Sequence, residues 1–70
     1  MEISARNQLK GTVKTVHLGE VMAEVVVVLS DGQEITSAIT KESVEHLHLK
    51  VGDKVAAIIK STEVMIGVEK

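Results

Sequence analysis

Two clusters of hydrogen-bond donors stand near the ends of the chain. The first is the run Ser4-Ala5-Arg6-Asn7-Gln8, which places a hydroxyl, a guanidinium and two amides within five residues. The second is Lys60-Ser61-Thr62, which follows an apolar run from Val55 to Ile59. Side chains of these types mainly donate hydrogen bonds, and charged donors bind anions strongly. The two clusters therefore suggest an anion site, formed where the two adjoining strands would lie side by side.

Each cluster also has an ordinary structural interpretation. An N-terminal segment is commonly a solvated tail, and a lysine that closes a buried strand commonly extends its ammonium group into water. A third donor-rich place is formed by Thr40 and Ser43. Thr40 is a good N-cap for a short helix, so plain capping explains these hydroxyls, although a helix N-terminus also suits anions. The convergence of three donor-rich places favours the anion site.

The chain shows no catalytic machinery. It contains no Ser/His/Asp arrangement, no paired carboxylates and no glycine-rich phosphate loop. His46 and His48 are two residues apart at a predicted helix end, where side chains do not face each other, and His17 stands alone. We interpret all three as surface residues. Since no Cys/His ligand cluster exists, we expect no directly ligated metal cation, and a binding protein rather than an enzyme.

Length and composition indicate one small domain that assembles with copies of itself. The 70 residues leave room for a single domain, 1–70, with 44% hydrophobic residues and no cysteine. A chain this short buries only about 60% of its unfolded surface. Without disulfides or a structural metal, oligomerisation is the remaining way to stabilise it. The lack of cysteine also fits a reducing cytoplasm.

Charge and hydropathy argue against two classes of partner. The net charge is −2 and there are no aromatic residues, whereas nucleic-acid binders carry basic patches and single-strand binders add aromatic stacking platforms. The longest apolar run falls far short of the roughly 20 residues of a membrane span. The N-terminal residues also lack the basic and apolar regions of a secretory signal. We expect neither nucleic acid nor a membrane as a partner.

The elements that must position the donors are short strands around one helix. Hydropathy patterns predict a helix over residues 41–47 and strands over residues 9–18, 21–30, 33–40, 54–60 and 64–68. The apolar parity changes near Lys14-Thr15, which predicts a bulge. Asp31-Gly32 predicts a hairpin turn, and Gly52 is expected to have positive φ in a later turn.

This order of elements is that of the OB-fold, a five-stranded Greek-key barrel. We therefore predict an all-β fold with one short helix between the third and fourth strands; an SH3-like barrel is the competing architecture. The run from Val25 to Leu29 is apolar on both faces, and such a strand is covered on both faces. Because a 70-residue domain cannot do this alone, the run predicts a subunit interface.

The sequence resembles the molbindin (Mop) family over nearly its whole length, to about Gly67. The opening Ser-Ala-Arg-Asn-Gln block and the closing Ile-Lys-Ser-Thr block carry the resemblance, together with Ala23-Glu24-Val25, residues 35–40 and Ser43-Val44. Free-standing molbindins are small cytoplasmic proteins that bind molybdate. The same domain occurs in molybdate-responsive transcription regulators and in the ATPase subunits of molybdate importers. The resemblance implies an OB-type barrel in a hexamer built as a trimer of dimers.

The resemblance also implies an oxyanion site between subunits. One subunit would contribute Ser4, Ala5 and Arg6, and its neighbour Lys60 and Ser61. Thr40 and Ser43 match polar positions that line the pocket in related domains. The family has a second class of site near the threefold axis, which the motif does not place. The predicted function is intracellular storage or buffering of molybdate or tungstate; the alternative is an OB-fold module that binds a protein or nucleic acid.

Overall fold

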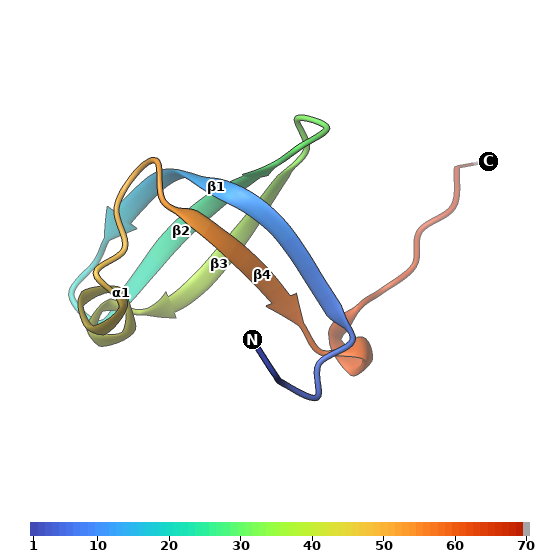
Figure 1. The fold of residues 1–70 in the computed structure, drawn as a ribbon, viewed down its shortest axis with the longest axis horizontal. Coiled ribbons are helices and arrows are strands. Elements are labelled where there is room, and N and C mark those ends of the chain that lie inside the picture. Colours follow the sequence, from blue (N-terminus) through green and yellow to red (C-terminus); the bar gives the residue numbers. More distant parts are fainter. Residues whose placement is uncertain (70) are drawn as a thin grey trace.

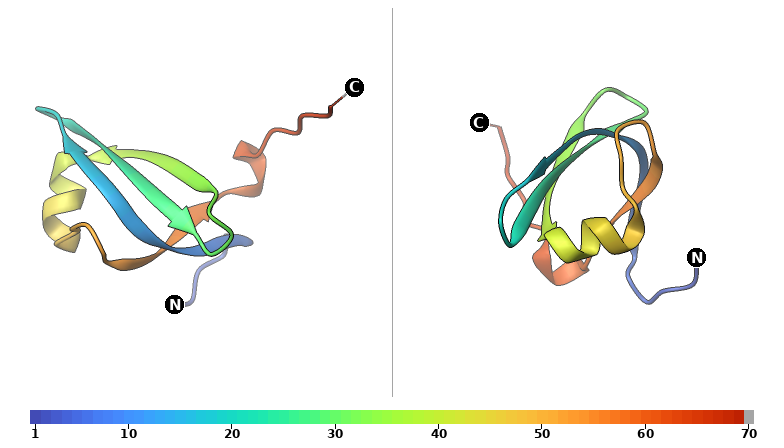
Figure 2. Two further views of the ribbon diagram at one scale, coloured as in Figure 1. Left: turned by 90° about the horizontal axis from the view of Figure 1, so that it is seen from above. Right: turned by 90° about the vertical axis from the view of Figure 1, so that its left-hand side faces the viewer.

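The computed structural model describes residues 1–69 and shows a mostly β protein with one short helix; Lys70, the last residue of the expected domain 1–70, lies outside the described residues. In chain order the elements are β1 (Asn7–Leu18), β2 (Met22–Leu29), β3 (Glu34–Thr40), α1 (Lys41–Leu47), β4 (Lys54–Ile59) and the 3-10 turn η1 (Ser61–Glu63). The strands form one antiparallel sheet in the order β3-β2-β1-β4. The sheet curls on itself, and α1 lies at one end of it (Figures 1 and 2).

The prediction of five strands is wrong, because the sheet of the described residues has four. Residues 64–68, the predicted fifth strand, are exposed and lack regular secondary structure. The chain leaves β4 through η1 and then runs away from the sheet (Figure 1). Sheet hydrogen bonds form between strands, so a segment without a neighbouring strand cannot become part of the sheet.

Alternation along β2 separates the two faces of the sheet. Ala23, Val25 and Val27 are buried, and with two further valines, Val13 of β1 and Val44 of α1, they form the core. On the opposite face, residues 26 and 28 are only half-buried. One chain therefore covers the inner face of β2 well and its outer face in part.

A bulge in β1 explains why its apolar pattern changes parity. Val13 pairs with Val27 but Thr15 pairs with Val26, so that Lys14 is the extra residue. The bulge keeps Val13 in the core and lets Val16 pack against it, as the change of parity predicts. The turn before β4 packs against β1 at the bulge. The N–H of Gly52, whose φ is 96°, donates to the carbonyl oxygen of Val13 at 2.9 Å.

Helix α1 begins and ends at identifiable caps. The hydroxyl oxygen of Thr40 accepts a hydrogen bond from the backbone N–H of Ser43 at 3.0 Å, which confirms Thr40 as the N-cap. The helix ends at His48, which takes the left-handed conformation with φ of 53°. Val44 points into the core. No helix within residues 1–69 is long and apolar enough to cross a membrane.

Candidate functional site

The pairing of β1 with β4 brings the two donor clusters to the same end of the sheet. The paired residues run from Asn7 opposite Ile59 to Thr12 opposite Lys54. The residues before Asn7 and after Ile59 therefore leave the sheet beside each other, at the end where Figure 1 shows both the N-terminal segment and η1. The side-chain amide of Asn7 donates to the carbonyl oxygen of Ile59 at 3.2 Å. The expectation that the two adjoining strands lie side by side is confirmed.

The N-terminal cluster is held by a local hydrogen bond. The side-chain amide of Gln8 donates to the carbonyl oxygen of Ala5 at 3.0 Å. Ala5 is half-buried, whereas Ser4 and Arg6 are exposed. The two amides of the predicted cluster, Asn7 and Gln8, thus bond to backbone oxygens, which leaves the hydroxyl and the guanidinium as the donors that face water.

Turn η1 sets the direction in which the second cluster leaves β4. Lys60 has an extended backbone, with φ of −64° and ψ of 137°, and its carbonyl oxygen accepts the N–H of Glu63 at 2.9 Å. The chain therefore turns directly after β4, and Ser61 begins the 3-10 turn. The side chains of Lys60 and Ser61 are both exposed.

Arg6 and Lys60 supply two positive charges to this end of the sheet. Neither side chain takes part in a salt bridge within residues 1–69. The carboxylates nearest to the clusters along the chain, Glu2 and Glu63, form no ion pair with them in this part of the protein. Guanidinium, ammonium and hydroxyl groups all donate to oxyanions, so this arrangement can bind a small oxyanion without a competing internal charge.

A single chain provides only one side of such a site. Ser4, Arg6, Lys60 and Ser61 are all exposed, so their donors face open solvent. An anion that gives up its hydration shell needs donors on several sides, because desolvating a charge without partners is very costly. One chain therefore presents the candidate donors on an open surface, on one side only.

Thr40 and Ser43 do not join the other predicted residues within the chain. They lie where β3 ends and α1 begins, at the opposite end of the sheet from η1 and the N-terminal segment (Figure 1). The Thr40 hydroxyl donates to the Oγ atom of Ser43 at 2.7 Å. Their capping role is confirmed; their contribution to an anion site in another subunit stays a prediction.

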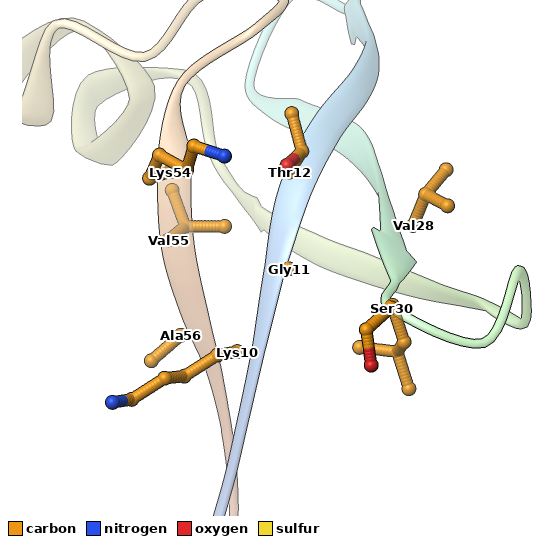
Figure 3. A pocket seen from close by; sticks show the side chains of 9 residues that line it. Lys10, Gly11, Thr12, Val28, Ser30, Lys54, Val55 and Ala56 are labelled. Atoms are coloured by element: carbon orange, nitrogen blue, oxygen red, sulfur yellow. The ribbon is translucent and has the colours of Figure 1, made fainter.

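A further set of donors, which no sequence motif singles out, lines a hollow of about 510 Å³ on the outer face of the sheet. Its polar side chains are Lys10, Thr12, Ser30 and Lys54. Figure 3 shows the amine of Lys54 turned toward Thr12, while Lys10 extends away past Ala56. Because the two ammonium groups point in different directions, we do not include the hollow in the candidate site. The hollow can be recognised only once the pairing of β1 with β4 is known, because this pairing places Thr12 opposite Lys54.

The titratable side chains outside the candidate site form no metal-binding cluster among the described residues, and two of them stabilise turns. No three His, Asp or Glu residues of the described chain lie close enough to hold a metal ion, and the three histidines are exposed, as predicted. A hydrogen bond from the Gln33 side chain lowers the pKa of Asp31 in the hairpin turn. A hydrogen bond from the Lys50 side chain likewise lowers the pKa of Asp53, in the turn before β4. Both carboxylates stabilise turns.

Comparison with known proteins finds a family model that covers most of this chain and relatives of similar length. Residues 3–66 match the model of the TOBE domain. Molybdenum-pterin-binding protein 3 of Clostridium pasteurianum is 53% identical over 66 residues, which cover 94% of this chain and 97% of that protein. The similarity therefore spans both chains almost end to end.

Solved structures agree with the sequence comparison. A molybdate-binding protein from Sporomusa ovata matches with a TM-score of 0.91 and 46% identity, covering 97% of this chain and 100% of that one. The cytoplasmic molybdate-binding protein ModG, in a crystal form with molybdate bound, matches with a TM-score of 0.93 and 51% identity, covering 99% of this chain and 49% of that one. The curled sheet with its single short helix is the architecture of these proteins.

Proposed function

The chain belongs to the molbindin (Mop) family of TOBE-domain proteins, and on that premise we propose that it binds molybdate or tungstate and stores or buffers the oxyanion in the cytoplasm. The observation that supports the proposal is the pairing of Asn7 with Ile59, because Ser4, Ala5 and Arg6 directly precede Asn7 and Lys60 and Ser61 directly follow Ile59. The relatives are named for binding, not for catalysis. We propose the same for this chain, as a single domain over residues 1–70.

The donor set suits a tetrahedral dianion. Molybdate has four acceptor oxygens and no proton at neutral pH, so every side of its pocket should present a donor. The hydroxyls of Ser4 and Ser61 and the backbone N–H of Ala5 supply directed hydrogen bonds, while Arg6 and Lys60 offset the charge. Phosphate keeps a proton near neutral pH and needs an acceptor for it, which a donor-only pocket lacks.

The complete site forms between subunits in this proposal, within a homo-oligomer arranged as a trimer of dimers. The exposure of the donors in one chain supports a second subunit that encloses the anion. Across a twofold axis, equivalent surfaces meet reciprocally, so Ser4, Ala5 and Arg6 of one subunit would face Lys60 and Ser61 of its neighbour. Thr40 and Ser43 would line the pocket only if another subunit brings them there.

Titration calorimetry with molybdate, tungstate, sulfate and phosphate tests the proposed function. Molybdate and tungstate should bind well, sulfate more weakly and phosphate hardly at all. Native mass spectrometry of the same samples counts the subunits and the bound anions together. Equal binding of molybdate and phosphate would contradict the donor-only site.

A further inference from the structure

Two side-chain amides next to the candidate site make hydrogen bonds of the same kind. Asn7 donates through its Nδ2 atom to the carbonyl oxygen of Ile59 at 3.2 Å, and Gln8 donates through its Nε2 atom to the carbonyl oxygen of Ala5 at 3.0 Å. Among the described residues, no other side chain donates a hydrogen bond to a backbone carbonyl oxygen. The two bonds are therefore a feature of this end of the sheet.

Both accepting carbonyls stand at the same position relative to a positively charged residue. Ile59 directly precedes Lys60, and Ala5 directly precedes Arg6. A backbone carbonyl belongs to the same planar peptide unit as the N–H of the next residue. Each amide therefore holds the plane of the peptide that leads into one of the two cations.

The two cations have little else to orient them. Neither Arg6 nor Lys60 forms a salt bridge among the described residues, and both are exposed. Long charged side chains lose much rotamer freedom when they are fixed, and a donor that is oriented in advance reduces this cost of binding. A held backbone directs where such a side chain starts, so the hydrogen bonds of the amides matter for an anion that the cations bind.

We propose that Asn7 and Gln8 are positioning residues of the oxyanion site, Asn7 for Lys60 and Gln8 for Arg6. This inference rests on the proposed function, because it names the residues that orient the two cations of that site. Each amide acts through the adjoining backbone and not by contact with the anion. The Asn7 bond is half-buried and joins residues 52 apart in sequence, whereas the Gln8 bond is exposed and spans three residues. Since water competes more with an exposed bond, the effect of Asn7 should be the larger.

Variants without the amide donor test the effect on affinity. Asn7→Leu and Gln8→Met remove the donor at nearly constant size and charge. In titration calorimetry, Asn7→Leu should weaken molybdate binding about 2- to 12-fold, and Gln8→Met should weaken it less. Gln33→Met is the matched control, because Gln33 is also exposed and donates its side-chain hydrogen bond in the turn between β2 and β3. An equal loss in the control, or no loss in Asn7→Leu, would overturn the proposal.

Double-mutant cycles separate positioning from a merely structural role. Asn7→Leu should cost little further affinity in a Lys60→Ala background, and should keep its full effect in an Arg6→Ala background. The reverse should hold for Gln8→Met. A general weakening of the fold would lower affinity alike in both backgrounds, and such additivity would overturn the proposal. Coupling of one amide alone would overturn the role of the other.

Nuclear magnetic resonance relaxation tests the positioning without any anion. In ligand-free Asn7→Leu, the backbone N–H of Lys60 should show a lower order parameter than in wild type, and that of Arg6 should not. Gln8→Met should give the opposite pattern. Asn7→Ala, which also lacks the donor, replaces the leucine variant if that variant does not fold. Order parameters that stay as in wild type would overturn the proposal.

The failure of this inference differs from that of the proposed function. If wild type binds no molybdate, the proposed function is wrong, and the relaxation data alone decide whether the amides hold the two peptides. If wild type binds molybdate but the cycles are additive, the proposed function stands and the positioning role is wrong.

Discussion

Arg6 and Lys60 are the charged donors at the shared end of β1 and β4, so binding of a dianion should depend on them most. Lys60→Ala removes a charge-assisted hydrogen bond of roughly 1.5–3 kcal/mol, which corresponds to a loss of affinity for molybdate of about 10- to 150-fold. Lys54→Ala is the matched control, because Lys54 is also exposed and lies at the other end of β4. Calorimetry should show little change for the control; equal losses would mean that only net charge matters.

Asp53 gives the turn before β4 a defined dependence on pH. Its carboxylate accepts hydrogen bonds from the Lys50 side chain at 2.9 Å and from the Lys50 backbone N–H at 3.0 Å. The side-chain bond is the largest cause of a pKa below the ordinary value of 3.8. The stabilisation is therefore complete above that value and is lost as the pH falls through the lower pKa of the folded state.

Comparison with Asp53→Asn isolates this effect. Below about pH 4, the free energy of unfolding should fall more steeply for wild type than for the variant, which has no proton to gain at this position. Urea denaturation between about pH 2 and pH 6 measures both curves. Parallel curves for the two proteins would show that the carboxylate is not coupled to folding.

At the scale of elements, the close approach of β1 to β2 requires a glycine. A Cβ atom on Gly11 would lie 2.5 Å from the carbonyl oxygen of Val28 and 2.6 Å from the Cγ1 atom of Val27. One of these neighbours is backbone, so relief requires the strands to move apart. Gly11→Ala should therefore lower stability by about 1–3 kcal/mol, as overpacking commonly does.

Gly67→Ala is the control for this prediction, because nothing lies within 4 Å of a Cβ atom at that position. Thermal unfolding should show a lower Tm for Gly11→Ala alone. An unchanged Tm for Gly11→Ala would mean that the spacing between β1 and β2 adjusts freely.

The sequence predicts those elements that local chemistry determines. The bulge at Lys14 follows from the change of parity between Val13 and Val16, and the start of α1 follows from Thr40, whose partner is only three residues away. The fifth strand could not be predicted this way. Residues 64–68 have the right alternation, but a strand also needs an unpaired edge within reach, and that depends on tertiary structure or on another molecule.

The candidate site shows the same distinction between what local chemistry determines and what tertiary structure determines. The proximity of the two terminal clusters was predictable, because each borders a strand and β1 and β4 are neighbours. The position of Thr40 was not, because the chemistry of a hydroxyl does not say at which end of a sheet it lies. Thr40 and Arg6 lie at opposite ends of the sheet, because β3 ends at one end and β1 begins at the other. Only the topology of the sheet determines this.

A single chain has few interactions that stabilise its folded state. The buried core of the described residues is one alanine and four valines, with no aromatic side chain in the protein. Larger apolar side chains, including Leu18, Met65 and Ile66, are about half or more exposed. Burial of aliphatic surface is the main favourable term in folding and association, so assembly should supply stability that the core of one chain does not.

Ligand binding and assembly must be linked if the oxyanion lies between subunits. A ligand that binds only the assembled state stabilises it by about 2.7 kcal/mol at a hundredfold excess over its dissociation constant. Saturating molybdate should therefore raise the temperature at which the oligomer dissociates, and by more than chloride at equal ionic strength. Thermal scans followed by light scattering measure the difference.

Two variants show whether this shift comes from the proposed site. Deletion of residues 1–6 removes Ser4 and Arg6 but keeps Asn7, whose amide bonds the end of β4, and it should abolish the molybdate-induced shift. Lys60→Ala should reduce the shift strongly. Neither change touches the apolar faces of β2 or the exposed residues 64–68, so ligand-free assembly should differ little from wild type. A full shift in either variant would place the oxyanion elsewhere, because a site shared between the N-terminal cluster of one subunit and Lys60 of another cannot keep its affinity when either half is missing.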